Sequence, residues 1–541
     1  MVRAHTKLIK RANQRISLGG AASLLVSAAL VGQLLGFLRV RLINANFSEF
    51  GPQSTDAFFA AFKIPDFFFY TIAAGALGVA FIPVLTDYFQ RHDKKGAWRI
   101  TSSLLNMTAI LMLVAGVIIF IFARPLLSIV APGLTNDQEH TAVLIMRLIA
   151  FNPLLFTLSG IITATQQALG RFFFFAIAPF FYNGSIIISA LIFSTAPGHS
   201  GGPGNLGLVG LGVGALVGAV LQLLIVAIGL QGTGFKWRPK IEVTNDFKGV
   251  LQRIPARSID QGVDSINSIA ETRFASRLGT GNITYYENAY TLHTVPIQLV
   301  GSTIATAAFP RLTDRLSSGR TDLFRRDFLL VLRAMVWIIM PIVVVAYFTR
   351  GYLSRLIFAQ GVSQISLIFG YLTGAIFFRT IYAILSRWFY AQKDTWTPLF
   401  ASLFVIALNI YLAYTLSQPS AYGVAGLAMA QSIAAGAEIV VLVVIMFVRD
   451  RKLFNVEFWR GMMAILSVTG FSVLTGAIMI SLFTLGANDK GIITLGSKLA
   501  LITIITFGVH LGVSAIFGLR EAVIVMDRLK KIMLKPVRLF Q

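Results

Sequence analysis

The sequence contains no cysteine, which excludes disulfide bonds, thiol catalysis and cysteine-based metal sites. Histidine is also scarce. There are six, and His140, His293 and His510 have no second ligand at metal-binding spacing. We therefore expect no metal centre and no cofactor. Charge is the other shortage, since Asp, Glu, Lys and Arg make up only 13% of the 541 residues.

Apolar residues take the place of the missing charge. The chain is 56% hydrophobic with a mean hydropathy of +0.74. Its apolar runs recur at about 20 residues, the length that spans a hydrocarbon core of about 30 Å. A soluble protein of this size would need more surface charge, and a transmembrane barrel would need short alternating strands. The composition therefore predicts an all-α polytopic membrane protein.

The apolar runs predict about fourteen transmembrane helices. The N-terminal run is too long for a cleaved signal peptide and lacks a small-residue cleavage site, so we expect it to remain as the first span. The predicted spans are 17–44, 54–90, 97–124, 138–169, 172–195, 206–231, 247–277, 283–315, 325–350, 363–392, 395–417, 421–448, 459–485 and 495–519.

The charges that are present are mostly basic, with 46 Lys and Arg against 23 Asp and Glu and a formal net charge of +23. They gather in loops such as 90–99, 311–326 and 449–460, which alternate with weakly charged loops. This alternation places both termini in the cytoplasm and the basic loops against anionic lipid headgroups. No basic face is interleaved with stacking aromatics on a soluble domain, so nucleic-acid binding is not expected.

One stretch, 55–87, combines an apolar character with features that break or charge a helix. It carries Asp56, Lys63 and Asp66, and prolines at Pro65 and Pro83. Charged side chains inside a membrane usually face a bundle interior or a wet cavity. We expect this stretch to be an interrupted helix that lines a cavity.

Parts of the sequence repeat. The pentapeptide that begins at Pro83 recurs as a similar one that begins at Pro310, an offset of 227 residues, and the stretch 127–133 is echoed at 353–361. Two echoes at nearly one offset predict two pseudo-symmetric six-helix lobes with a substrate path between them. We place the N-lobe at 1–235, the C-lobe at 236–450, and two further helices with a basic cytoplasmic tail at 451–541. Glycines spaced by four, at Gly210, Gly214 and Gly218, predict close helix packing.

The stretch 55–87, preceded by LLGFLR at 34–39, resembles the MurJ/MviN lipid II flippases of the MOP exporter superfamily. The resemblance implies two six-helix lobes around a central cavity and two additional helices that form a groove for lipid. It also implies a function: moving the undecaprenyl-pyrophosphate-linked peptidoglycan precursor, lipid II, to the outer leaflet of the bacterial inner membrane by alternating access. Proteins of cell-wall synthesis and anionic lipids are the other expected partners.

The sequence departs from this family pattern at charged positions. Of two arginines in the first helix only Arg39 remains, with Gln33 at the first position. Phe69 and Tyr70 stand where the family has an arginine pair, and Thr291 replaces an arginine of the eighth helix. Arginine suits a pyrophosphate because its planar fork binds phosphate oxygens in pairs and remains charged when buried.

Several polar and charged residues inside the predicted spans are candidates for the site. The substrate-binding candidates are Gln33, Arg39, Asp56, Lys63, Arg257, Thr291, Arg379 and Arg387. Asp260, Asp264 and Glu271 share one face of the seventh span, together with Asn267 and Ser268, and are candidates for charge pairing or ion coupling. We expect this acidic stripe to face the cavity and pair with Arg39, Lys63, Arg379 or Arg387.

Two alternatives remain open from the sequence. The chain could export another lipid-linked oligosaccharide or a cationic compound, which the acidic stripe would suit, or it could be a membrane scaffold without transport. No catalytic triad, metalloprotease motif or nucleotide-binding loop is present, and Asp314, Asp322 and Asp327 lie among arginines that would neutralise them. We therefore expect a transporter and not an enzyme.

Overall fold

A computed structural model describes residues 18–74, 81–486, 489 and 491–523, and within them every regular element is helical. The side chains of residues 18–19, 21–22, 73–74 and 253–261 lie outside the description. The all-α prediction is confirmed. Helices are the expected solution because they satisfy their backbone hydrogen bonds internally, without help from water.

Packing divides the chain into two units, residues 1–284 with 357–360 and residues 285–356 with 361–541. The first unit contains α2 (Leu18–Asn46), α3 (Thr55–Phe69), the π-helix η1 (Tyr70–Ala74), α4 (Ile82–Gln90), α5 (Lys94–Ile121), α6 (Ala123–Val130), α7 (Asn136–Ile149), α8 (Asn152–Ala168), α9 (Phe173–Ile192), the short η3 (Pro203–Asn205), α10 (Leu208–Ile228), α11 (Asn245–Ser276) and the first turn of α12 (Asn282–Pro296).

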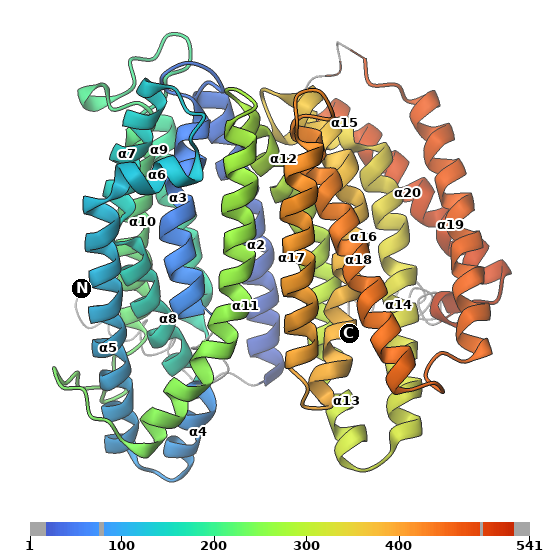
Figure 1. The fold of residues 1–541 in the computed structure, drawn as a ribbon, viewed down its shortest axis with the longest axis horizontal. Helices are drawn as coiled ribbons and strands as arrows, with labels where there is room; N and C mark the ends of the chain where they lie inside the picture. The colour runs from blue at the N-terminus through green and yellow to red at the C-terminus, as the bar shows by residue number, and fades with distance from the viewer. Residues whose placement is uncertain (1–17, 75–80, 487–488, 490, 524–541) are drawn as a thin grey trace, which may run out of the picture. The chain divides into compact units, whose positions relative to one another are not determined.

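The second unit contains the rest of α12 and the helices that follow it (Figure 1). These are the π-helix η4 (Ile297–Ser302), α13 (Thr303–Ser317), α14 (Thr321–Phe348), α15 (Arg350–Ile357), α16 (Val362–Ala391), α17 (Trp396–Leu416), α18 (Val424–Arg449), α19 (Val456–Leu482) and α20 (Ile492–Ile516). Helix α11 groups with the first unit because it packs on η1, α3 and α6. The lobe boundaries at 235 and 450 stay predictions.

Twelve helical stretches of the described chain are long and apolar enough to cross a membrane. Each matches one of the predicted spans. The two other predicted spans, 54–90 and 247–277, are also helical, as α3, η1 and α4 in one case and α11 in the other. They fall outside the twelve because 54–90 is divided into shorter helices and α11 carries many charged and polar side chains.

The two halves of the chain repeat the same helix boundaries. Adding the offset of 227 residues to the starts of α2, α3, η1, α5 and α6 gives the starts of α11, α12, η4, α14 and α15. The ends of α4 and α5 map in the same way onto the ends of α13 and α14. The predicted duplication is therefore confirmed at the level of individual helices, over a much longer stretch than the two sequence echoes.

The interruption predicted within 55–87 is present. Helix α3 passes directly into the π-helix η1 at Tyr70, and η4 begins at the repeat-related Ile297. A π-helix shifts the hydrogen-bond register by one residue and loosens the local packing, and such segments are frequent at functional sites. Each half therefore contains one irregular turn at the same place in its chain.

Small residues bring α9 and α10 together along their length (Figure 1). A Cβ atom on Gly214 would overlap Ser189, and one on Gly218 would lie 2.9 Å from the Tyr182 ring. The Ser189 hydroxyl donates a hydrogen bond to the Gly210 carbonyl at 2.5 Å. The helix packing predicted from the glycine spacing is confirmed.

We expect Gly214→Val to lower the stability of the full chain by about 1–3 kcal/mol, because the new side chain would force α9 and α10 apart. Thermal unfolding in detergent would measure the change. Gly184→Val is the matched control, since Gly184 lies on α9 with no neighbouring atom within 4 Å of its Cβ position. Equal losses in the two variants would contradict the packing role.

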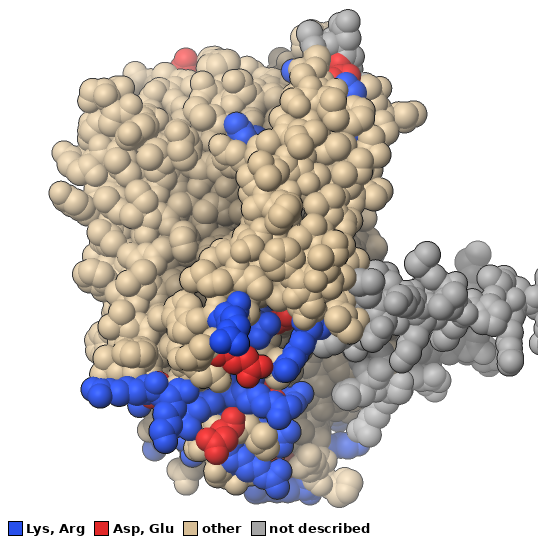
Figure 2. Space-filling model, turned by 90° about the vertical axis from the view of Figure 1, so that its right-hand side faces the viewer, with Lys and Arg blue, Asp and Glu red and all other residues tan. Residues whose placement is uncertain are grey.

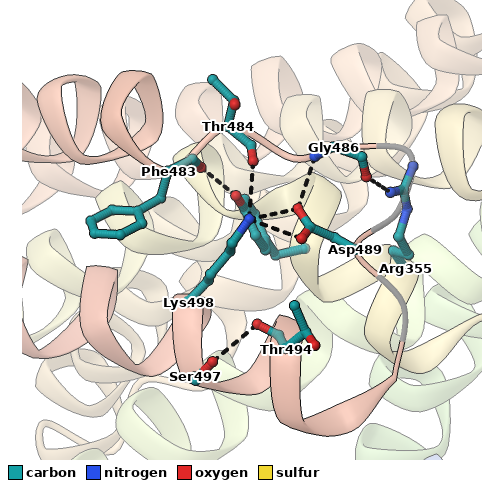
Figure 3. Close-up of polar contacts among 9 residues, drawn as sticks. Arg355, Phe483, Thr484, Gly486, Asp489, Thr494, Ser497 and Lys498 are labelled. Atoms are coloured by element: carbon teal, nitrogen blue, oxygen red, sulfur yellow. Dashed lines mark hydrogen bonds and ion pairs between the residues drawn. The ribbon is translucent and has the colours of Figure 1, made fainter.

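Polar contacts hold the loop between α19 and α20 against α15 (Figure 3). Arg355 donates a hydrogen bond to the Gly486 carbonyl at 2.7 Å, and the Tyr352 hydroxyl donates one to the Phe483 carbonyl. Lys498 pairs with Asp489 at 2.7 Å, and Asp489 also accepts a hydrogen bond from the Gly486 amide. The last two long helices are thereby anchored to the second unit at this end.

A second polar cluster joins the start of α17 to the end of α18. Asp394 accepts hydrogen bonds from the Thr397 hydroxyl at 2.6 Å and the Thr397 amide at 3.0 Å, and it pairs with Arg449 at 2.6 Å. Burial by itself would raise the pKa of Asp394, but the hydrogen bonds from Thr397 and Arg449 outweigh it and lower the pKa to about 2. The charged carboxylate therefore stabilises this end of the unit.

Because the pKa of Asp394 is lower in the folded chain than its ordinary value of 3.8, its contribution to stability is complete above pH 3.8 and is lost as the pH falls toward about 2. We expect the melting temperature of wild type to fall more steeply between pH 5 and pH 2.5 than that of Asp394→Asn. Asp314→Asn, at an exposed position, should follow wild type. Parallel curves for wild type and Asp394→Asn would refute this assignment.

Candidate functional site

Asp56 lies at the start of α3 and is buried, with 1% of its surface exposed. Its two carboxylate oxygens accept hydrogen bonds from the Gly281 amide at 2.5 Å and from the amide and hydroxyl of Thr284 at 2.8 and 2.7 Å. These are amides of the first turn of α12, and Gly281, which precedes that helix, has no side chain to cap it. Asp56 thus caps α12 from another helix, and these three donors account for its carboxylate.

Lys63 points from α3 toward the polar face of α11. Its ammonium donates a hydrogen bond to the Ser268 hydroxyl at 2.8 Å. One turn further along α11, the Asn267 amide donates to Glu271 at 3.0 Å, and both of these side chains are buried. The predicted stripe therefore meets Lys63 through Ser268 and holds Glu271 inside the first unit.

The other stripe residues divide between exposed and undescribed positions. Asp264 is exposed on α11. Arg257 and Asp260 lie outside the described side chains, so their pairing stays a prediction.

Arg39 is half-buried on α2, on the same helix as Gln33. Its charge and that of Asp66 both act on the hydroxyls of Tyr70 and Tyr182, which places the four side chains in one neighbourhood. Among the described residues no hydrogen bond or ion pair joins Arg39 to another side chain. An arginine in such a place keeps its donors available for a ligand.

Asp66 also borders a small pocket between α3 and α8 that Asn152 lines. Both polar atoms of the Asn152 amide are buried and have no hydrogen-bond partner in the described chain. A buried amide of this kind is costly unless a partner reaches it. The pocket therefore adds polar groups close to the Arg39 neighbourhood.

In the second unit, Arg379 on α16 pairs with Glu438 on α18 at 3.4 Å. Glu438 is fully buried and accepts a hydrogen bond from Ser402 at 2.7 Å. The Ser402 hydroxyl lies 3.2 Å from that of Tyr382. These residues form a polar network inside an otherwise apolar unit.

Two further candidates of the second unit have local contacts. The Arg387 guanidinium lies 5.5 Å from the ring centres of Phe309 and Tyr390. The Thr291 hydroxyl donates to the Glu287 carbonyl at 2.9 Å, a hydrogen bond within its own helix. Whether Thr291 or Arg387 contacts a substrate stays a prediction.

The family model "Lipid II flippase MurJ" matches residues 50–499, which is most of the chain. The chain belongs to the MurJ family. A probable lipid II flippase MurJ from Rhizobium tropici is 26% identical over 524 residues, which cover 93% of this chain and 95% of the relative. A probable lipid II flippase MurJ from Buchnera aphidicola subsp. Acyrthosiphon pisum is 26% identical over 390 residues, covering 70% of this chain and 74% of the relative.

Solved structures share the MurJ fold. The lipid II flippase MurJ in an inward closed conformation superposes with a TM-score of 0.72 at 20% identity, covering 91% of this chain and 98% of that one. An inward-facing multidrug resistance MATE family transporter of the MOP superfamily gives a TM-score of 0.63 at 16% identity, covering 82% and 98%. These similarities are similarities of fold.

Within this MurJ family member, sequence reasoning missed Glu438 and Asn152 as candidates. Glu438 had a usable signal, because it is the one acidic residue in the apolar stretch of α18. Asn152 had none, since an asparagine after a helix end is an ordinary capping residue. The repeat offers a further signal: the offset of 227 carries Asp66 onto His293, and His293 lies within electrostatic range of Arg379. Each unit thus has a polar cluster next to its π-helix.

We expect Glu438→Gln and Arg379→Met each to destabilise the protein by about 3–5 kcal/mol, because each leaves a buried charge without its partner. The double variant should recover at least half of that loss. Thermal unfolding of the four proteins would give the coupling energy. Additive losses in the double variant would show that the pair does not act as a unit.

Proposed function

We propose that this protein moves lipid II from the inner to the outer leaflet of the bacterial inner membrane by alternating access. The observation that carries the proposal is the family match over residues 50–499, on a chain with twelve helical stretches able to cross a membrane. A pyrophosphate-linked sugar-peptide head cannot cross hydrocarbon unaided. A membrane protein must therefore shield the head while the prenyl tail remains in lipid.

Arg39 is our leading candidate for contact with the pyrophosphate. It has no ion-pair partner among the described residues, and the tyrosines around it supply hydroxyl groups that can also bind phosphate oxygens. Lys63, Arg379 and Arg387 are secondary candidates, because each is already engaged by contacts within its own unit. Gln33, Arg257 and Thr291 remain candidates from the family pattern. We assign Asp56 a structural role as the cap of α12.

The two π-helices are natural places for movement during alternating access. Each lies at the same position in its half of the chain, and each follows directly on a regular helix. A π-helical turn can revert to an α-helical one with a shift of one residue, which would rotate the helix beyond it. We propose that η1 and η4 absorb the bending of their helices.

Further features of the proposal come from charge. We propose that both termini lie in the cytoplasm, that the basic loops contact anionic lipids, and that the protein acts without catalysis beside proteins of cell-wall synthesis. The basic stretches 90–99, 311–326 and 449–460 support this orientation.

Rescue of a bacterium depleted of its lipid II flippase tests the function. We expect the wild-type protein to restore growth and Arg39→Ala to lose rescue, with lipid II transport in liposomes reduced about 10–100-fold, the cost of one charge-assisted phosphate contact. Arg39→Lys should retain part of the activity, since it keeps the charge but loses the bidentate fork. Arg91→Ala is the matched control, because Arg91 is an exposed arginine of the same unit.

Full rescue by Arg39→Ala would remove Arg39 from the proposed site. Failure of the wild-type protein to rescue, despite correct insertion, would instead favour a transporter of another lipid-linked oligosaccharide or a scaffold.

A further inference from the structure

A basic groove lies at one end of the second unit, away from the residues discussed above. Five cationic side chains from α14, the α18–α19 loop and the residues after α20 line it: Arg325, Arg326, Arg333, Lys452 and Arg520. Its apolar wall consists of Leu329, Leu330, Leu453 and Phe458. It is open to solvent, with a volume of about 1000 Å³. We call it the α14–α19 groove.

The face that carries α19 shows the same separation of charge on a larger scale. In Figure 2, Lys and Arg gather at the lower end of this face, with few Asp and Glu among them, while the broad band above is almost free of charge. An uncharged band with a basic edge is the pattern expected where a protein surface leaves the hydrocarbon and meets anionic headgroups.

The cations of the groove exceed the acids that surround them. Asp322 and Glu457 also line the groove. Arg325 pairs with Asp322 and Asp450. Arg520 pairs with Glu457 at 3.5 Å.

Two of the lining cations remain available. Within the described chain, Arg326 and Lys452 have no carboxylate partner, and both are exposed. The groove therefore has two cations that can bind an anion without breaking an existing pair.

Arg333 provides a fixed cation at the inner end of the groove. Its side chain is 11% exposed and pairs with Glu521 at 3.0 Å, while its Nε has no hydrogen-bond partner in the described residues. The guanidinium lies against the backbone of α19 at Gly461, where a Cβ atom would overlap it. The absence of a side chain at Gly461 thus makes room for Arg333.

The surroundings of the groove decide what kind of anion fits it. Helix α19 leaves the groove with a row of exposed apolar side chains, including Val456, Trp459 and Met463, of which 73%, 49% and 57% are exposed. Leu330 on α14 is also exposed. A free phosphate would use only the cations. A phospholipid would use both features, with its phosphate on the cations and its acyl chains along α19.

We infer that the α14–α19 groove binds the headgroup of an anionic glycerophospholipid. Arg326 and Lys452 hold the phosphate, Arg333 supplies a fixed positive charge behind it, and the exposed apolar side chains of α19 contact the acyl chains. The inference does not depend on the proposed function, because the groove shares no residue with the Arg39 neighbourhood and its test measures lipid binding and not transport.

The test uses the purified full-length protein in an uncharged detergent, titrated with phosphatidylglycerol and followed by native mass spectrometry and thermal unfolding. We expect the combined variant Arg326→Gln with Lys452→Gln to weaken phosphatidylglycerol binding roughly thirty-fold, as two lost surface cations would. Lys94→Gln with Lys95→Gln is the matched control, since it removes two exposed cations from the first unit. We expect it to change binding less than about threefold.

A second variant tests the fixed cation. We expect Gly461→Ala to displace Arg333 and weaken phosphatidylglycerol binding while leaving binding of phosphatidylcholine unchanged. If this variant fails to fold, the Arg326 and Lys452 pair still decides the question.

Three results would overturn the inference. Equal weakening by the two double variants would show general attraction to charge. Stabilisation by inorganic phosphate equal to that by phosphatidylglycerol would show a site for free phosphate. Equal binding of phosphatidylcholine would show apolar contact alone.

Discussion

Hydrocarbon offers no hydrogen-bond partner to a polar group, and the organisation of this protein follows from that constraint. Every regular element of the described chain is a helix, since a helix satisfies its own backbone. Charges inside the helical units are engaged locally, as Arg379 is with Glu438 and Lys63 with Ser268. Where a helix must begin in a buried place, as α12 does, a carboxylate from α3 caps it. Polar groups thus occur inside the units mainly where another polar group meets them.

Duplication supplies the architecture within which these contacts form. The two halves repeat the boundaries of their helices at an offset of 227 residues, including the start of the π-helix. The side chains have diverged far more than the boundaries. Asp66 in one half corresponds to His293 in the other, and each is accompanied by a different polar neighbour, Asn152 or Arg379. Helix geometry was kept while the chemistry of each half changed.

The charges divide into groups with different physical roles. Asp56 and Glu438 are buried and engaged in hydrogen bonds, which stabilises the folded units. Arg39 retains its donors in the part of the chain that the structure describes, and it is the arginine that the family pattern and the geometry both single out. The cations of the α14–α19 groove form a separate group at the edge of the uncharged band. A single count of positive charge conceals this division.

The sequence by itself determined the fold class, because long apolar runs with basic loops admit only a bundle of membrane helices. It also determined the duplication and the interruption near Tyr70, since local spacing and repeated residues carry that information. The partners of the charged side chains were decided only by the tertiary structure. Asp56 meets Gly281 and Thr284, and Arg379 meets Glu438, across separations that no local pattern encodes. The physical reason is that helix periodicity states which face a residue occupies, while packing decides which other helix covers that face.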